Sequence, residues 1–87
     1  MEKYVKILTP FCKERGYDEI YYVGTWKNNP IFWVKFSWAK PFMKLGAPMI
    51  YSIDKNGEAS KVDRKDISDI IKLESFENRK LIHKFDS

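Results

Sequence analysis

The chain has a single cysteine, Cys12, and only four glycines and four prolines among its 87 residues. One thiol excludes an intramolecular disulfide, and it excludes a zinc site or redox pair built from cysteines. The glycines are scattered singly, so there is no glycine-rich loop to hold a phosphate. No apolar run approaches the roughly 20 residues that span a bilayer, and charges interrupt the N-terminus before a secretory core forms. These absences predict a cytoplasmic protein that has no membrane segment and no nucleotide cofactor.

The residues that are present favour a folded domain. Hydrophobic residues make up 44% of the chain, aromatic residues 16% and charged residues 32%, a balance typical of a globule with one core. The net charge is +4, and the excess lies in the first half, where residues 1–48 hold eight Lys/Arg against four Asp/Glu. Such an excess fits an acidic protein surface, RNA or DNA, and it is also ordinary solubilising charge. We expect residues 1–87 to form a single domain.

The first segment repeats apolar residues at helical spacing and is followed by Gly16, a natural helix stop. This pattern predicts a helix over residues 2–15. Pro10 lies inside that range, so Thr9-Pro10 could instead begin a shorter helix.

A hairpin is predicted next, because strand formers fill residues 18–26 and 31–39 on either side of the turn sequence 27–30. Side chains of the second strand alternate between two faces. The face predicted to be buried carries Phe32, Val34, Phe36 and Trp38. Lys35 shares the other face with Trp33, which is the aromatic residue that we expect to be exposed.

A second hairpin follows a connection over residues 40–47. Pro48 opens a strand that ends at Ile53, Asp54-Lys55-Asn56-Gly57 is a tight-turn sequence, and residues 58–62 return. Asp63 then starts a helix predicted to end near Leu73, and residues 75–87 fit either a short helix or a last strand. The predicted fold is α+β, with an N-terminal helix, a four-stranded, mostly antiparallel sheet of two hairpins and a C-terminal helix.

No constellation of residues predicts catalysis, a metal or a cofactor. Cys12 falls on an apolar helix stripe, where small buried thiols are common, and lies far along the chain from His83, the one histidine. Asp63, Asp66 and Asp69 share one side of a helix, but Lys and Arg are interleaved with them, as on a solvated helix face. The sequence therefore favours a binding protein over an enzyme.

The candidate binding residues combine an exposed ring with cations. They are Trp33, Lys35, Lys40 and Lys44. Aromatic and cationic side chains near a sheet edge commonly anchor protein contacts. Rings flanked by cations also bind single-stranded nucleic acid, but the chain lacks the glycine-aromatic pattern of an RNA-recognition motif and any helix-turn-helix or zinc signature.

The order helix, aromatic strand, loop and hairpin resembles a known family. Ile31-Phe32-Trp33-Val34, the segment Gly46-Ala47-Pro48 and the turn Asp54-Lys55-Asn56-Gly57 carry the similarity, which covers residues 1–73. These segments resemble the YrhB-like group of small bacterial immunity proteins in polymorphic-toxin systems. The resemblance implies a cytoplasmic protein that binds and neutralises a cognate toxin and has no chemistry of its own. The charge of +4 departs from the acidic character expected of a protein that plugs a nuclease groove.

The sequence is also compatible with two other functions. One is a small RNA-binding module or RNA-cleaving toxin that uses the basic excess and His83, for which affinity would fall steeply with salt. The other is a structural subunit, such as a homodimer, whose sheet edge pairs with its own copy.

Overall fold

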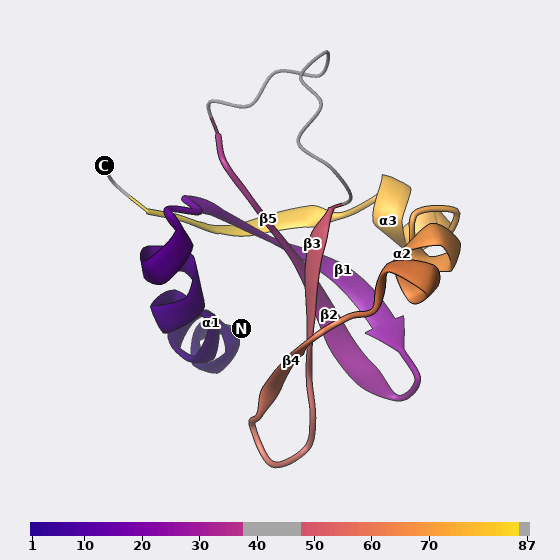
Figure 1. Ribbon diagram of the computed structural model, residues 1–87, viewed down its shortest axis with the longest axis horizontal. Coiled ribbons are helices and arrows are strands. Elements are labelled where there is room, and N and C mark those ends of the chain that lie inside the picture. The colour runs from indigo at the N-terminus through magenta and orange to yellow at the C-terminus, as the bar shows by residue number, and fades with distance from the viewer. Residues whose placement is uncertain (38–47, 86–87) are drawn as a thin grey trace.

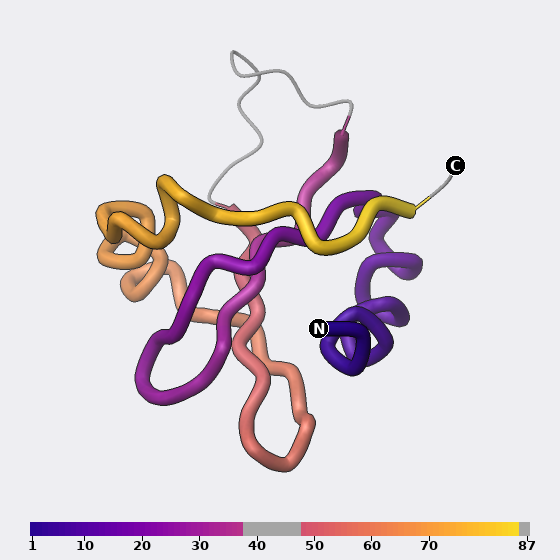
Figure 2. The backbone as a smooth tube through the Cα atoms, turned by 180° about the vertical axis from the view of Figure 1, so that it is seen from behind, coloured from indigo at the N-terminus to yellow at the C-terminus, as the bar shows by residue number. Residues whose placement is uncertain are grey.

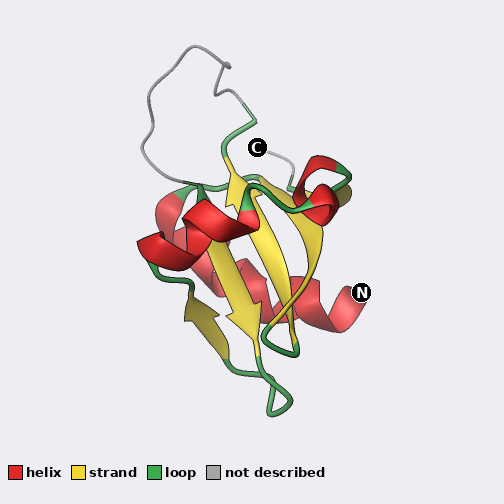
Figure 3. Ribbon diagram, turned by 90° about the vertical axis from the view of Figure 1, so that its right-hand side faces the viewer, coloured by secondary structure: helices red, strands yellow, loops and turns green. Residues whose placement is uncertain are grey.

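The computed structural model of the protein describes residues 1–37 and 48–85. In chain order, its elements are α1 (Glu2–Arg15), β1 (Glu19–Trp26), β2 (Asn29–Lys35), β3 (Met49–Ile53), β4 (Ala59–Lys61), α2 (Arg64–Ile70), α3 (Glu74–Glu77) and β5 (Lys80–Lys84). Helix α1 lies on one side of the sheet, and the short helices α2 and α3 lie on the other (Figures 1 and 3). The predicted α+β class is confirmed.

The described strands form one five-stranded antiparallel sheet in the order β4-β3-β2-β1-β5. The prediction of four strands was therefore incomplete. The missing strand is β5, which comes from the segment left open between helix and strand and lies along β1, far from it in sequence (Figure 2). Residues 74–77 of the same region form α3, so the tail contains both a short helix and a strand. Local periodicity does not reveal such pairing, because the partner strand lies about sixty residues upstream.

Helix α1 runs unbroken through Pro10. Pro10 is exposed, and the Thr9 hydroxyl donates a hydrogen bond of 2.7 Å to the carbonyl of Val5. The helix ends at Gly16, whose φ of 81° is left-handed, and the Tyr17 N–H closes the end by bonding to the carbonyl of Cys12. The predicted bounds of this helix are confirmed.

Strand β2 and the second predicted helix differ from their predicted bounds. Strand β2 begins at Asn29 and ends at Lys35 rather than running over 31–39, and residues 38 and 39 lie outside the described residues. Its early start follows from the turn at Lys27 and Asn28, which have φ values of 51° and 69° and join the strands through two residues. The helix predicted to reach Leu73 ends at Ile70.

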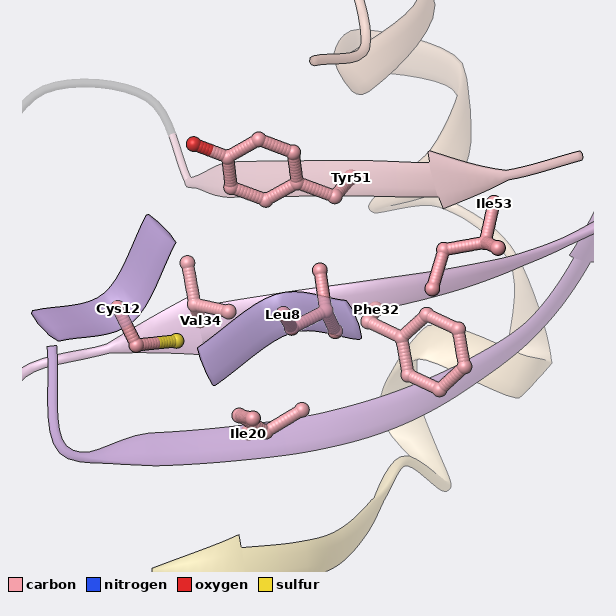
Figure 4. Close-up of a cluster of buried hydrophobic side chains, with 7 residues drawn as sticks. All are labelled: Leu8, Cys12, Ile20, Phe32, Val34, Tyr51 and Ile53. Atoms are coloured by element: carbon pink, nitrogen blue, oxygen red, sulfur yellow. The ribbon is translucent and has the colours of Figure 1, made fainter. Parts of the chain in front are cut away.

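The core is divided into two clusters by the sheet. The cluster under α1 contains Leu8, Cys12, Ile20, Phe32, Val34, Tyr51 and Ile53 (Figure 4). The cluster under α2 contains Val23, Ile31, Ile50, Val62, Ile67 and Ile70. Phe32 and Val34 are buried as predicted, whereas Phe36 is half-buried and stacks on Tyr17 with ring centroids 4.6 Å apart. Trp38 lies outside the described residues.

We predict that Gly24→Ala destabilises the fold by about 3 kcal/mol, since it combines a strained backbone with overpacking. Gly24 has a φ of 122°, and an added Cβ would lie 3.1 Å from Cβ and Oγ of Ser75, a residue of α3. Gly16→Ala is the matched control, because its φ is 81° and its nearest neighbour would be 3.8 Å away. It should cost only about 1–2 kcal/mol. Urea denaturation of both variants measures the difference, and equal losses would contradict the role of Ser75.

A second prediction concerns Asp18, which joins the ends of three strands. It accepts hydrogen bonds from the Ser37 backbone N–H, at 2.6 Å, and from the Ser37 hydroxyl. Its own N–H bonds to the Lys35 carbonyl, and its carbonyl accepts from Phe85. Burial by itself raises the pKa of the Asp18 carboxyl, but the Ser37 bonds and the Lys84 charge outweigh it, so the pKa lies below its ordinary value.

A lowered pKa in the folded state stabilises the fold above the unfolded pKa of about 3.9, and this stability is lost as pH falls through the folded value. Asp18→Asn should therefore cost about 0.5–1 kcal/mol at pH 7, the range for a partly exposed hydrogen bond, and less at pH 2.5. Asp69→Asn changes an exposed carboxyl on α2 and should cost nothing measurable at either pH. Denaturation curves at the two pH values test this, and a loss for Asp18→Asn that does not depend on pH would contradict it.

Candidate functional site

A group of aromatic rings and cations lies on the sheet face beside α3. We call Tyr21, Trp33, Lys35, Phe76 and Arg79 the Trp33 cluster. Tyr21 and Trp33 are opposite each other in the β1–β2 register, so their side chains share a face. Their ring centroids are 5.3 Å apart, and Phe76 of α3 brings a third ring 5.4 Å from Trp33.

Two cations contact the Trp33 ring. The Arg79 guanidinium carbon is 4.5 Å from the Trp33 centroid, and the Lys35 ammonium is 5.3 Å from it. The guanidinium also lies 5.0 Å from the Phe76 ring and 5.8 Å from the Tyr21 ring. Cation–π attraction stabilises each contact by about 0.5–2 kcal/mol, the larger values applying where water is displaced. The rings therefore form a platform that holds Arg79.

A hydrogen bond to a nearby backbone carbonyl fixes the position of Arg79. Its Nη1 donates a hydrogen bond of 3.0 Å to the Phe76 carbonyl, at the end of α3. Its Nε is buried and has no hydrogen-bond partner. The guanidinium is thus held in one orientation, with donors left unused.

The cluster continues to the edge of the sheet through β5. Leu81 lies opposite Tyr21 in the β1–β5 register, and 49% of its surface is exposed. At the other end of the face, Glu19 is 92% buried, with an exposed fraction of 8%, and accepts a 3.4 Å hydrogen bond from the Tyr21 hydroxyl. Burial raises the pKa of Tyr21, the Glu19 charge and hydrogen bond raise it further, and Arg79 opposes the rise.

The sequence predicted part of this cluster. Trp33 and Lys35 share a face as the alternation predicted, but Trp33 is half-buried rather than exposed, because Phe76 and Arg79 cover it. Lys40 and Lys44 lie outside the described residues. Tyr21, Phe76, Arg79 and Leu81 were missed. The alternation of β1 could have indicated Tyr21, but no local signal places α3 against the Trp33 ring or β5 beside β1.

The other predicted candidates lie elsewhere. Cys12 lies on the inner face of α1 and is fully buried, as expected of a core thiol. His83 lies on β5 with its ring 4.4 Å from that of Phe85, edge to face. Asp66 pairs with Lys27 at 3.5 Å. Over residues 1–37 and 48–85, no three His, Cys, Asp or Glu side chains converge as a metal site.

A polar hollow lies between the β1–β2 turn and α2. Trp26 lines it, with a buried Nε1 that has no acceptor, and so do Lys27, Lys61, Asp63 and Asp66. Its two cations are matched by two carboxylates, so the hollow has no net charge to select a ligand. The Trp33 cluster, in which two cations share one ring, is the stronger candidate.

No helix in the described part of the chain is long and apolar enough to cross a membrane. In comparisons with known proteins, no family model, curated protein or solved structure matches this chain. The resemblance to immunity proteins thus stays a prediction, and the site has to be judged on its own geometry.

We predict that Cys12 does not react with thiol reagents while the protein is folded. Burial raises its pKa from 9.0 to about 11, which leaves about 100-fold less thiolate at pH 8 and adds a steric barrier. Ellman's reagent should label the thiol slowly in buffer and at once in guanidinium. Equal rates in the two conditions would contradict the buried position.

Proposed function

We propose that this chain is an immunity-type protein, which binds and neutralises a cognate bacterial toxin domain through the Trp33 cluster and the neighbouring Leu81. The observation that carries the proposal is the cluster itself, where an aromatic and cationic centre meets an exposed leucine at the sheet edge. Trp, Tyr and Arg are the residues that most often dominate binding energy at protein interfaces. The proposal includes a cytoplasmic location, because a producing cell must neutralise its own toxin before the toxin acts there.

The rigidity of the cluster supports binding without reorganisation. Tyr21 and Trp33 are attached to paired central strands, and Arg79 is hydrogen-bonded to α3. Ordering a free arginine or lysine at an interface costs about 0.5–1.5 kcal/mol, and a side chain already held in place avoids most of this cost.

RNA binding is the second candidate, and the two cations on the Trp33 ring favour it. However, sequence-tolerant RNA binding depends on bases stacking on free ring faces. In the Trp33 cluster the rings already contact one another and the two cations. The geometry therefore supports a protein partner better than a single strand.

A homodimer formed by the β5 edge is disfavoured by charge. In a two-fold antiparallel pair of β5 strands centred on Ile82, Lys80 of one copy would lie opposite Lys84 of the other. Like charges directly opposite each other destabilise paired strands. The β1–β5 register shift between Ile20 and Tyr21 places Ile82 in a bulge, which also discourages edge pairing.

We predict that Leu81→Ser and Trp33→Ala each weaken toxin binding by at least about 30-fold, the effect of losing a hot-spot residue. The tagged chain is used to capture its partner from nuclease-treated extract, and the partner is then produced alone and together with each variant. The partner should arrest growth alone, and the wild-type chain should restore it. Leu81 is exposed, so its change tests the face even if Trp33→Ala proves unstable.

Ile71→Ser is the matched control, since Ile71 is also an exposed aliphatic residue, at the end of α2. It should bind and protect like the wild type. If the captured protein is harmless when produced alone, the proposed immunity function is wrong. Equal protection by all three variants would remove the Trp33 cluster as the binding face.

A further inference from the structure

Arg79 is a partly buried cation to which the described structure gives no anionic partner. The one ion pair within residues 1–37 and 48–85 joins Lys27 and Asp66, at 3.5 Å. Aromatic rings attract the Arg79 charge, but they do not supply hydrogen-bond acceptors along the guanidinium edge. One Nη1 bond to the Phe76 carbonyl leaves most of the five N–H donors unused.

The carboxylates of the same region do not neutralise it. Glu19 is buried and accepts the Tyr21 hydroxyl. Glu74 and Glu77, on α3, are exposed and form no ion pair with Arg79. The described part of this chain therefore supplies no carboxylate that pairs with Arg79.

Neighbouring cations strengthen the local positive potential. Lys35 lies on the same Trp33 ring, and Lys84 is exposed on β5, on the face that carries Tyr21 and Leu81. Lys80 pairs with Tyr22 and lies on the opposite face. Cations gathered around an apolar centre attract an acidic surface and repel a basic one. A planar guanidinium held in place binds a carboxylate through two parallel hydrogen bonds at little entropic cost.

We infer that Arg79 is the anchor for a carboxylate of the partner, so that the Trp33 cluster binds an acidic protein segment. The inference rests on the proposed function and adds the chemistry of the partner. It also gives the net charge of +4 a role, because a basic inhibitor suits a toxin whose contact surface is acidic rather than one with a basic nucleic-acid groove.

The test uses two polyanions of similar charge, octaglutamate peptide and octauridylate, titrated into the full chain and followed by NMR. Octaglutamate should shift the Trp33 indole and Arg79 Nε–H resonances in a saturable way. Arg79→Gln should lower its affinity at least about tenfold, as expected when a charge-assisted pair is lost. Arg79→Lys should bind octaglutamate more tightly than Arg79→Gln but more weakly than the wild type, because the lysine ammonium cannot make the paired hydrogen bonds.

Lys55→Gln is the matched control, since it also removes one positive charge but lies in the exposed turn between β3 and β4. It should change the affinity less than twofold. Equal losses for Arg79→Gln and Lys55→Gln would overturn the inference in favour of attraction by net charge alone. Tighter binding of octauridylate at the same resonances would overturn it in favour of RNA.

The failures of the two proposals can be told apart. If octaglutamate does not bind at Arg79 while Leu81→Ser still loses the captured toxin, the carboxylate anchor is wrong and the binding face stands. If octaglutamate binds at Arg79 while Leu81→Ser and Trp33→Ala keep full protection, the carboxylate site stands and its use against a toxin is wrong.

Discussion

Strand β2 crosses the middle of the sheet and has to be covered on both faces, because Phe32 and Val34 point to one side and Ile31 to the other. Each of these side chains is buried almost completely, which stabilises the fold by about 1.5–3 kcal/mol apiece. Helix α1 covers the first face. The second depends on α2, whose Ile67 and Ile70 close over Ile31.

The candidate site lies on this second face, beside α3. Helix α2 packs over Ile31 and Ile50, and Ile50 lies opposite Trp33 in the β2–β3 register. On the β1 side, α3 brings Phe76 against the Trp33 ring. Arg79 completes the cover there with a charged group instead of an apolar one. A half-buried cation such as Arg79 is suited to binding, because a partner can supply the hydrogen-bond acceptors that the fold does not provide for its N–H donors.

The positions of the cations in the Trp33 cluster agree with an acidic partner. The Trp33 cluster collects cations from β2 and from the α3–β5 connection, while its one neighbouring buried carboxylate, Glu19, is engaged by Tyr21. The strand β5 adds exposed lysines at the edge. The fold thus brings two cations from separate elements onto one ring, while Glu74 and Glu77 of α3 are exposed and form no ion pair with them.

The sequence by itself determined the local elements: helix α1 from its apolar spacing and Gly16, the two hairpins from their turns, and the shared face of Trp33 and Lys35 from strand alternation. These features depend on neighbours within a few residues. Only the tertiary structure decided the fifth strand, the half-buried state of Trp33 and the placement of Arg79 on its ring. Those features arise because β5 pairs with a strand about sixty residues upstream and brings α3 against β1, and no local pattern encodes which distant strand a segment will join.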